Sequence, residues 1–207
     1  MDPVWTKEVK LRRRAEDPLG LARVSEWITS ELLPGITTTT VVARNYSFYC
    51  WSIYDLSKKS SIRNRNDFAE ELTKREGAFV IASLLHHRNE EGIKTPHGYN
   101  VGSRVLENSN KTVTMNFRVS RSNPEGFYGL YYRGSLNALG LTRRRRRFDE
   151  LTQLGRQVAL AYENNIKNTK YYQIFIAKNT IPKKALREYG EKACICLLKR
   201  KTREREL

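Results

Sequence analysis

The sequence contains few cysteines, and they fit neither of the patterns that would cross-link a small fold. Cys50, Cys194 and Cys196 are an odd number of thiols, which argues against a disulfide framework. The Cys-x-Cys pair has no second pair of ligands at zinc-finger spacing. We therefore expect reduced core thiols, no metal site and no cofactor.

Long apolar runs are also missing. No stretch approaches the roughly 18 apolar residues of a membrane span. The N-terminus carries charged residues and lacks the apolar segment of a secretory signal. These absences predict a chain with no membrane partner, located in the cytoplasm, or in the nucleus if the source is eukaryotic.

No complete catalytic motif can be assembled from this sequence. We find no Asp…Glu-x-Lys nuclease constellation, no phosphate-binding glycine loop and no paired-histidine hydrolase motif. His86 and His87 are adjacent on an expected helix, where neighbouring side chains point about 100° apart, and His97 follows in an expected loop. We favour helix-end histidines over a metal or acid–base site, and a non-enzymatic protein over an enzyme.

Positive charge is abundant. The 207 residues include 38 lysines and arginines against 22 acidic residues, which gives 38 − 22 = +16. Such an excess indicates a polyanionic partner, nucleic acid or an anionic membrane surface, with a solubilising surface as the alternative. Five consecutive arginines concentrate the charge locally, which favours nucleic acid; they are Arg143, Arg144, Arg145, Arg146 and Arg147.

The hydrophobic fraction of 39% is enough for a folded core of one large domain or two small ones. Apolar periodicity predicts helices over residues 19–33, 40–56 and 67–87. We expect a threonine to cap the second, and Asn66-Asp67 with Glu70 to cap the third. Gly77 marks either a close packing contact or a break in the third helix.

Arg44, in the second of these helices, has two interpretations. It could contact phosphate, or it could lie in an aromatic-rich core helix, snorkelling to the surface or paired with an acid; we favour the core helix. Residues 1–16, with three arginines, are expected to form a solvated tail rather than a groove-binding arm.

Two strand-like segments give the chain a minor β component. Residues 112–120 alternate apolar and polar side chains, which predicts a strand with one buried face. Residues 171–177 are also strand-like, and Thr180-Ile181-Pro182 then begins a last helix. The charged ending is a tail or, alternatively, the start of a further region.

The arginines lie between two helical segments. A helix or strand-to-helix transition over residues 127–139 stops at Gly140, and Thr152 caps a helix that runs to Ile166. The sequences LNALGL and LTQLGRQVA on either side of the arginines resemble the end of a winged-helix domain. The resemblance covers about 35 residues and implies that the arginines occupy the wing and contact phosphates or the minor groove. It also implies that the preceding helix presents Arg133, Ser135 and Asn137 to the bases.

A second resemblance covers residues 33–51, LPGITTTTVVARNYSFYCW. This stretch is similar to the N-terminal part of uncharacterised prokaryotic proteins that accompany mobile-element and antiphage defence loci. Val42 and Asn45 depart from that pattern. The resemblance implies a defence or mobile-DNA context.

These observations predict a mainly α protein with a minor β component (α+β). We expect a helical N-terminal bundle over residues 1–125, a winged-helix-like basic segment over 126–170, and a strand–helix extension over 171–207. The leading functional hypothesis is a non-enzymatic subunit that binds double-stranded DNA. One alternative is a subunit of a nuclease or defence effector complex whose active site a partner completes, and another is a scaffolding subunit that docks on an acidic protein.

Overall fold

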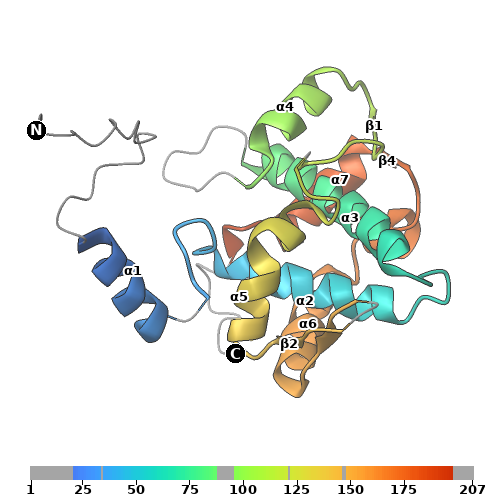
Figure 1. The fold of residues 1–207 in the computed structure, drawn as a ribbon. Coiled ribbons are helices and arrows are strands. Elements are labelled where there is room, and N and C mark those ends of the chain that lie inside the picture. Colours follow the sequence, from blue (N-terminus) through green and yellow to red (C-terminus); the bar gives the residue numbers. More distant parts are fainter. Residues whose placement is uncertain (1–20, 34, 88–95, 121, 146–147, 198–207) are drawn as a thin grey trace, which may run out of the picture. The chain divides into compact units, whose positions relative to one another are not determined.

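The computed structural model describes residues 21–33, 35–87, 96–120, 122–145 and 148–197. The chain divides into two compact units, residues 1–34 and residues 35–207. Helices dominate and the strands are short, so the prediction of a mainly α fold with a minor β component is confirmed (Figure 1). No helix in the described ranges is both long and apolar enough to cross a bilayer.

The first unit contains helix α1, Leu21–Leu32, which confirms the helix expected over residues 19–33. Its large apolar side chains are exposed, among them Trp27 at 64% and Leu32 at 74%. The tail expected over residues 1–16 lies outside the described residues.

Helix α2, Ala43–Ser57, runs through the centre of the second unit (Figure 1). It packs against α6 (Gln153–Ile166) and α3 (Arg65–His86). Of the apolar positions that predicted the helix, Tyr46, Tyr49, Ile53 and Leu56 are buried, and Val42, the N-cap, is half-buried. A threonine cap was wrong, because the helix begins after Val42 without a side-chain cap and the Thr40 hydroxyl accepts from the Thr37 N–H instead.

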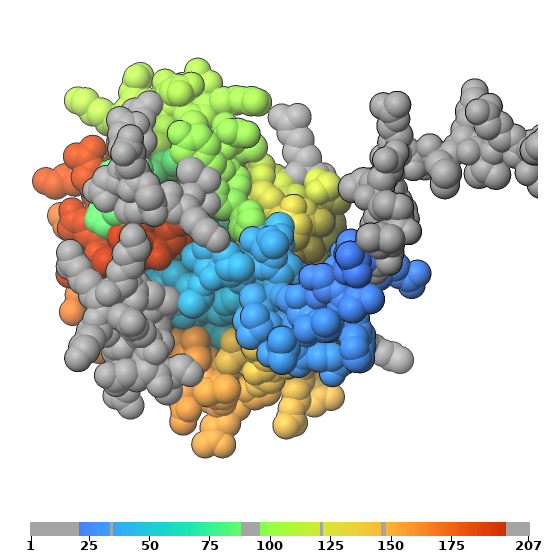
Figure 2. Space-filling view, turned by 90° about the vertical axis from the view of Figure 1, so that its left-hand side faces the viewer, coloured from blue at the N-terminus to red at the C-terminus, as the bar shows by residue number. Residues whose placement is uncertain are grey.

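The outer surface of this unit shows how α2 is enclosed. In Figure 2 the light-blue segment that leads into α2 lies between the green region of α4 (Tyr99–Glu107) and the orange region of α6. Further along, Trp51 is fully buried and its ring stacks on Tyr162 of α6, with ring centroids 5.4 Å apart. Most of the length of α2 therefore belongs to the core.

Helix α3 begins at Arg65, and its N-cap, Asn64, lies before the expected cap at Asn66-Asp67. The Asn64 side chain accepts the N–H groups of Asn66 and Asp67, and the Asp67 carboxylate accepts the Asn64 N–H. This is a capping box, so Asn64 and Asp67 fill the roles that we assigned to Asp67 and Glu70. Gly77 does not break the helix, because a Cβ there would lie 3.1 Å from the Phe117 ring. It marks a close packing contact, one of the two expected alternatives.

The second face of α3 packs against α4 and α7 (Lys183–Ala193). Strand β1, Thr112–Thr114, pairs antiparallel with β4, Thr180–Pro182, and places buried Val113 opposite buried Ile181. The expected strand over residues 112–120 is thus confirmed only at its start.

The expected strand over residues 171–177 is wrong, because this segment forms the π-helical turn η2, Tyr171–Phe175. Tyr171 is buried against Tyr189 of α7, with ring centroids 4.3 Å apart, and the Tyr172 hydroxyl donates to Glu163 of α6. Apolar β propensity is weak compared with such packing, so helices α6 and α7 decide the conformation.

One hydrophobic core runs through the second unit. It includes Phe48 of α2, Tyr128 from the segment that we expected to be winged-helix-like, and Leu186 of α7. Residues from all three expected segments therefore meet in the same core.

Candidate nucleic-acid interface

The helix before the arginines ends in a tight glycine turn. It consists of the π-helical segment η1 (Tyr128–Tyr132) and α5 (Arg133–Ala138). Gly140 has a φ of 67°, its N–H donates to the Asn137 carbonyl, and the Leu141 N–H donates to the Leu136 carbonyl. This pair of hydrogen bonds is a Schellman motif, which confirms Gly140 as the stop signal.

The chain returns to the same point at Thr152, 11 residues after Leu141. The Thr152 N–H donates to the Leu141 carbonyl at 3.0 Å, and its hydroxyl donates to the Gly140 carbonyl at 2.7 Å. That hydroxyl also accepts the Gly155 N–H at 3.1 Å, which confirms Thr152 as the cap of α6. A Cβ on Gly155 would lie 2.1 Å from the Leu141 oxygen, so glycine permits this approach. We call these four residues, 140, 141, 152 and 155, the hairpin base.

A short β-hairpin projects from this base. Strand β2, Thr142–Arg143, pairs antiparallel with β3, Glu150–Leu151. The expected order of helix, basic tip and capped helix is therefore present. Arg143, Arg144 and Arg145 are exposed on the hairpin. Arg146 and Arg147 lie outside the described residues.

Arg145 forms an ion pair on the hairpin surface. Its Nε lies 3.0 Å from Glu150 Oε2, and both side chains are more than half exposed, at 58% and 57%. Exposed pairs of this kind contribute about 1 kcal/mol or less, so the pair could be exchanged for a phosphate. The hairpin therefore carries its positive charge toward solvent.

The hairpin is also joined to the preceding helix by a buried carboxylate. Asp149 accepts hydrogen bonds from Arg133 Nε at 2.7 Å, from Arg133 Nη2 at 3.1 Å and from the Tyr128 hydroxyl at 2.6 Å. Burial alone would raise the pKa of Asp149, but the bonds from Arg133 and Tyr128 outweigh it and lower the pKa below its usual value. Asp149 and Tyr128 were not predicted as site residues. The sequence does place one acidic residue, Asp149, just after the arginines and Phe148, and this position could have indicated an ion pair with an arginine.

Arg133, Ser135 and Asn137, the residues expected to face the bases, all have partners within the chain. Arg133 is bound to Asp149, the buried Ser135 hydroxyl donates to the Tyr131 carbonyl, and the exposed Asn137 amide donates to the Thr142 carbonyl. These bonds fasten α5 to itself and to the hairpin. Contact of the three side chains with bases stays a prediction.

An open cleft of about 290 Å³ lies beside Arg133. Its polar lining consists of Arg65, Asn66, Asn123, Glu125 and Arg133. Arg65 Nε lies 2.6 Å from Glu125 Oε1, so both arginines of the cleft are paired with carboxylates. The cleft therefore offers less uncompensated positive charge than the hairpin.

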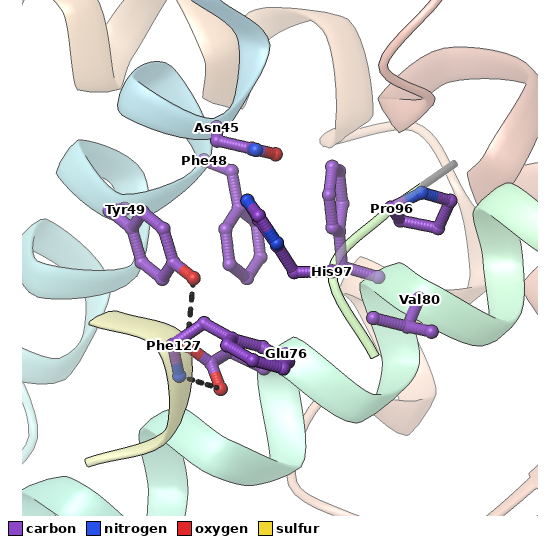
Figure 3. Close-up of a pocket in the computed structure, with 9 residues that line it drawn as sticks. Asn45, Phe48, Tyr49, Glu76, Val80, Pro96, His97 and Phe127 are labelled. Atoms are coloured by element: carbon purple, nitrogen blue, oxygen red, sulfur yellow. Dashed lines mark hydrogen bonds between the residues drawn. The ribbon is translucent and has the colours of Figure 1, made fainter. Parts of the chain in front are cut away.

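A second buried carboxylate holds the start of η1. Glu76 of α3 accepts hydrogen bonds from the Tyr49 hydroxyl and from the N–H groups of Phe127 and Tyr128, in the pocket drawn in Figure 3. Burial raises the pKa of Glu76 to about 7, although all three hydrogen bonds lower it. Three donors occupy most of the roughly four acceptor positions of a carboxylate, so Glu76 positions this helix rather than offering a free base.

His97 lies in the same pocket and is separate from His86 and His87. Its Nε2 is 2.7 Å from the Thr39 carbonyl, and its ring packs against Phe127 and Tyr131, with centroids 5.3 and 5.2 Å apart. The ring thus fills space between aromatic side chains.

Arg44 is confirmed as part of a core helix. It is 1% exposed, stacks on the Tyr162 ring at 4.4 Å, and donates to the carbonyls of Ala193 and Lys192. These contacts differ from the snorkelling or acid pairing that we expected, because the end of α7 supplies unpaired carbonyls that a buried guanidinium can satisfy.

The described residues contain one group that could hold a metal ion, formed by His86, His87, Cys194 and Cys196. Motif spacing in the sequence does not reveal this group, because the histidine pair and the cysteine pair are more than a hundred positions apart. The expectation that the two imidazoles point apart is wrong. His87 is the C-cap of α3, with a φ of −130° and a ψ of 43°, and the two ring centroids are 4.1 Å apart.

Function must be inferred from these residues themselves. No family model, no curated protein and no solved structure matches the chain.

Proposed function

We propose that this chain is a non-enzymatic DNA-binding protein or subunit that grips the phosphate backbone of a duplex through the arginine hairpin, residues 142–151. The observation that supports this most directly is the exposure of Arg143, Arg144 and Arg145 on a hairpin whose two ends are bonded together. We further propose, from the sequence resemblance of residues 33–51 alone, that the duplex belongs to a defence or mobile-element system.

Guanidinium chemistry suits a phosphate ligand. Each arginine keeps its charge at any physiological pH and presents several N–H donors in a planar fork, which matches two oxygens of one phosphate. A fixed hairpin base reduces the conformational entropy that would be lost when the arginines bind. The proposed wing thus combines charge with preorganisation.

Acidic residues near the hairpin do not neutralise it fully. Asp149 is occupied by Arg133 and Tyr128, and Glu150 faces Arg145 in an exposed pair. The proposed phosphate contacts therefore depend mainly on Arg143 and Arg144. Readout of bases by Arg133, Ser135 and Asn137 is a separate proposal, which would require Arg133 to leave Asp149.

The test is the salt dependence of duplex binding by the full chain. Each phosphate neutralised contributes about 0.9 to the slope of log K against log salt. Replacing Arg143 and Arg144 with alanine should reduce the magnitude of the slope by about 1.8 and weaken binding at low salt. Fluorescence anisotropy with a labelled duplex, at four or more salt concentrations, measures both quantities.

The matched control replaces two exposed arginines on other elements, Arg104 of α4 and Arg187 of α7. It removes the same net charge, so a purely non-local effect of charge would change both variants equally. An unchanged slope in R143A/R144A, or an equal change in R104A/R187A, contradicts the assignment of the hairpin.

The same titrations distinguish the ligand class. Tighter binding to single strands or to double-stranded RNA would contradict a duplex DNA partner, but the hairpin would still be the proposed contact with nucleic acid. Co-purification of an acidic protein in the absence of nucleic acid would favour the scaffolding alternative. Cleavage of DNA on addition of magnesium or manganese would favour the nuclease alternative.

A further inference from the structure

Two pairs of metal-binding side chains meet at the ends of two packed helices. His86 is the last residue of α3 and His87 is its C-cap, while Cys194 is the C-cap of α7 and Cys196 follows two residues later. One ligand atom from each of the four residues lies within 4.8 Å of every other. Cys196 Sγ and His86 Nδ1 are 3.8 Å apart.

We propose that His86, His87, Cys194 and Cys196 bind one zinc ion that stabilises the junction of α3 and α7. Two thiolates and two imidazoles are a complete donor set for a four-coordinate structural zinc. Sulfur and nitrogen donors also disfavour magnesium and calcium, which prefer oxygen ligands.

The distances fit this ion after a small adjustment. Tetrahedral zinc, with bonds of about 2.3 Å to sulfur and about 2.0 Å to nitrogen, holds its ligand atoms about 3.3 to 3.8 Å apart. The 3.8 Å separation of Cys196 and His86 is at the upper end of that range, and no separation in the group is greater than 4.8 Å, so none exceeds the range by more than about 1 Å. Rotation of side chains at helix ends can supply such a change.

The fold places the two cysteines independently of any metal. A Cβ on Gly190 would lie 2.3 Å from the Ala82 carbonyl oxygen and 3.2 Å from His86 Cβ, so glycine allows α7 to lie directly against the end of α3. Arg44 donates to the carbonyls of Lys192 and Ala193 and thereby holds the turn that carries Cys194. The Leu197 N–H donates to the Cys194 carbonyl and closes the Cys-x-Cys turn.

Burial indicates a structural role for the ion. Cys194 is fully buried, both ring nitrogens of His87 are shielded from solvent, and the other two residues are only partly exposed. A catalytic zinc would keep one position open for water, whereas these four side chains fill all four positions.

Binding has a definite proton balance. The two thiols lose their protons to solvent and the two imidazoles bind as neutral rings, so a dication and two thiolates form a neutral site. The structure shows all three cysteines as free thiols. Affinity should therefore fall as pH decreases, because protons compete with the metal for all four ligands.

The test uses the full chain, kept reduced and purified without chelator. We expect about one zinc ion per chain by elemental analysis. After removal of the metal, cobalt(II) should give the visible bands of a tetrahedral site and a thiolate charge-transfer band. A folded metal-free chain that gives neither band would overturn the proposal, and this measurement needs no variant.

Two variants then identify the ligands. Cys196→Ser, at a partly exposed position, should weaken cobalt binding by more than about 100-fold, the upper end of the loss when only a second-shell partner is removed. Cys50→Ala removes the thiol of α2 and should leave both bands and zinc content unchanged. Cobalt affinity that is unchanged in C196S, or bands that vanish in C50A, would contradict the assignment. Since nucleic acid plays no part in this experiment, its result is independent of the proposed DNA binding.

Discussion

Two buried ionisable side chains in this protein satisfy the ends of helices. Arg44 donates to the last carbonyls of α7, and Glu76 accepts the first N–H groups of the helix that begins at Phe127. The placement of Arg44 agrees with the dipole of α7, whose carbonyl end attracts positive charge, and Glu76 acts as a hydrogen-bond acceptor for its helix. Both side chains thereby join α2 or α3 to a segment distant in the sequence.

Loss of Arg44 should be costly. Arg44→Met keeps an unbranched apolar stem but leaves the carbonyls of Lys192 and Ala193 without its two hydrogen bonds. We expect the free energy of unfolding to fall by about 2 to 4 kcal/mol. Urea denaturation measures the change, and Arg104→Met, at an exposed position of α4, should remain within about 0.5 kcal/mol of the wild type. A loss below about 1 kcal/mol in R44M would mean that solvent replaces the cap.

At the scale of elements, the hairpin depends on a junction between helices. The end of α5 and the start of α6 meet at the hairpin base, where the Thr152 N–H donates to the Leu141 carbonyl and Gly155 lies against the same oxygen. Helix α5 has only six residues and would not be stable by itself. It continues from η1, and tertiary bonds hold the combined helix at both ends, from Glu76 to the start of η1 and from the hairpin to the end of α5.

Alanine substitutions at two glycines distinguish the effect of packing at this junction from the effect of helix propensity. Gly155→Ala places a methyl group 2.1 Å from the Leu141 oxygen and should destabilise the protein by about 1 to 3 kcal/mol. Gly134→Ala, within α5, meets no atom of the described structure within 4 Å and should stabilise it by about 0.5 to 1 kcal/mol. Denaturant unfolding of both variants gives the comparison, and the same sign for both would contradict this account of the base.

At the scale of the whole molecule, one core rich in aromatic side chains unites the second unit. The core also encloses groups whose ionisation affects global stability. Glu76 is the clearest case, because burial raises its pKa to about 7, against 4.5 for an ordinary glutamate.

This difference predicts the sign of a pH effect. Between pH 4.5 and 7 the folded protein retains a proton on Glu76 that the unfolded chain releases, so the stability from this group is complete below pH 4.5 and declines as pH rises through 7. Asp149 acts in the opposite direction and at lower pH, since its pKa is lowered.

The measurement compares urea midpoints of wild type and Glu76→Gln across pH 4.5 to 7. The wild type should lose stability relative to E76Q as pH rises. Parallel curves would show that the pKa of Glu76 is the same in the folded and the unfolded protein.

The sequence by itself determined the helical class, most helix positions, the stop at Gly140 and the cap at Thr152, because these follow from local periodicity and from the backbone demands of helix ends. It also located the arginine tip, since burying five adjacent arginines would cost too much free energy. Only the tertiary structure decided the roles of Asp149, Glu76 and Arg44, the conversion of residues 171–177 from strand to helical turn, and the meeting of His86 and His87 with Cys194 and Cys196. Each depends on contacts between segments far apart in the chain, and neither spacing nor local propensity encodes which helix ends will pack together.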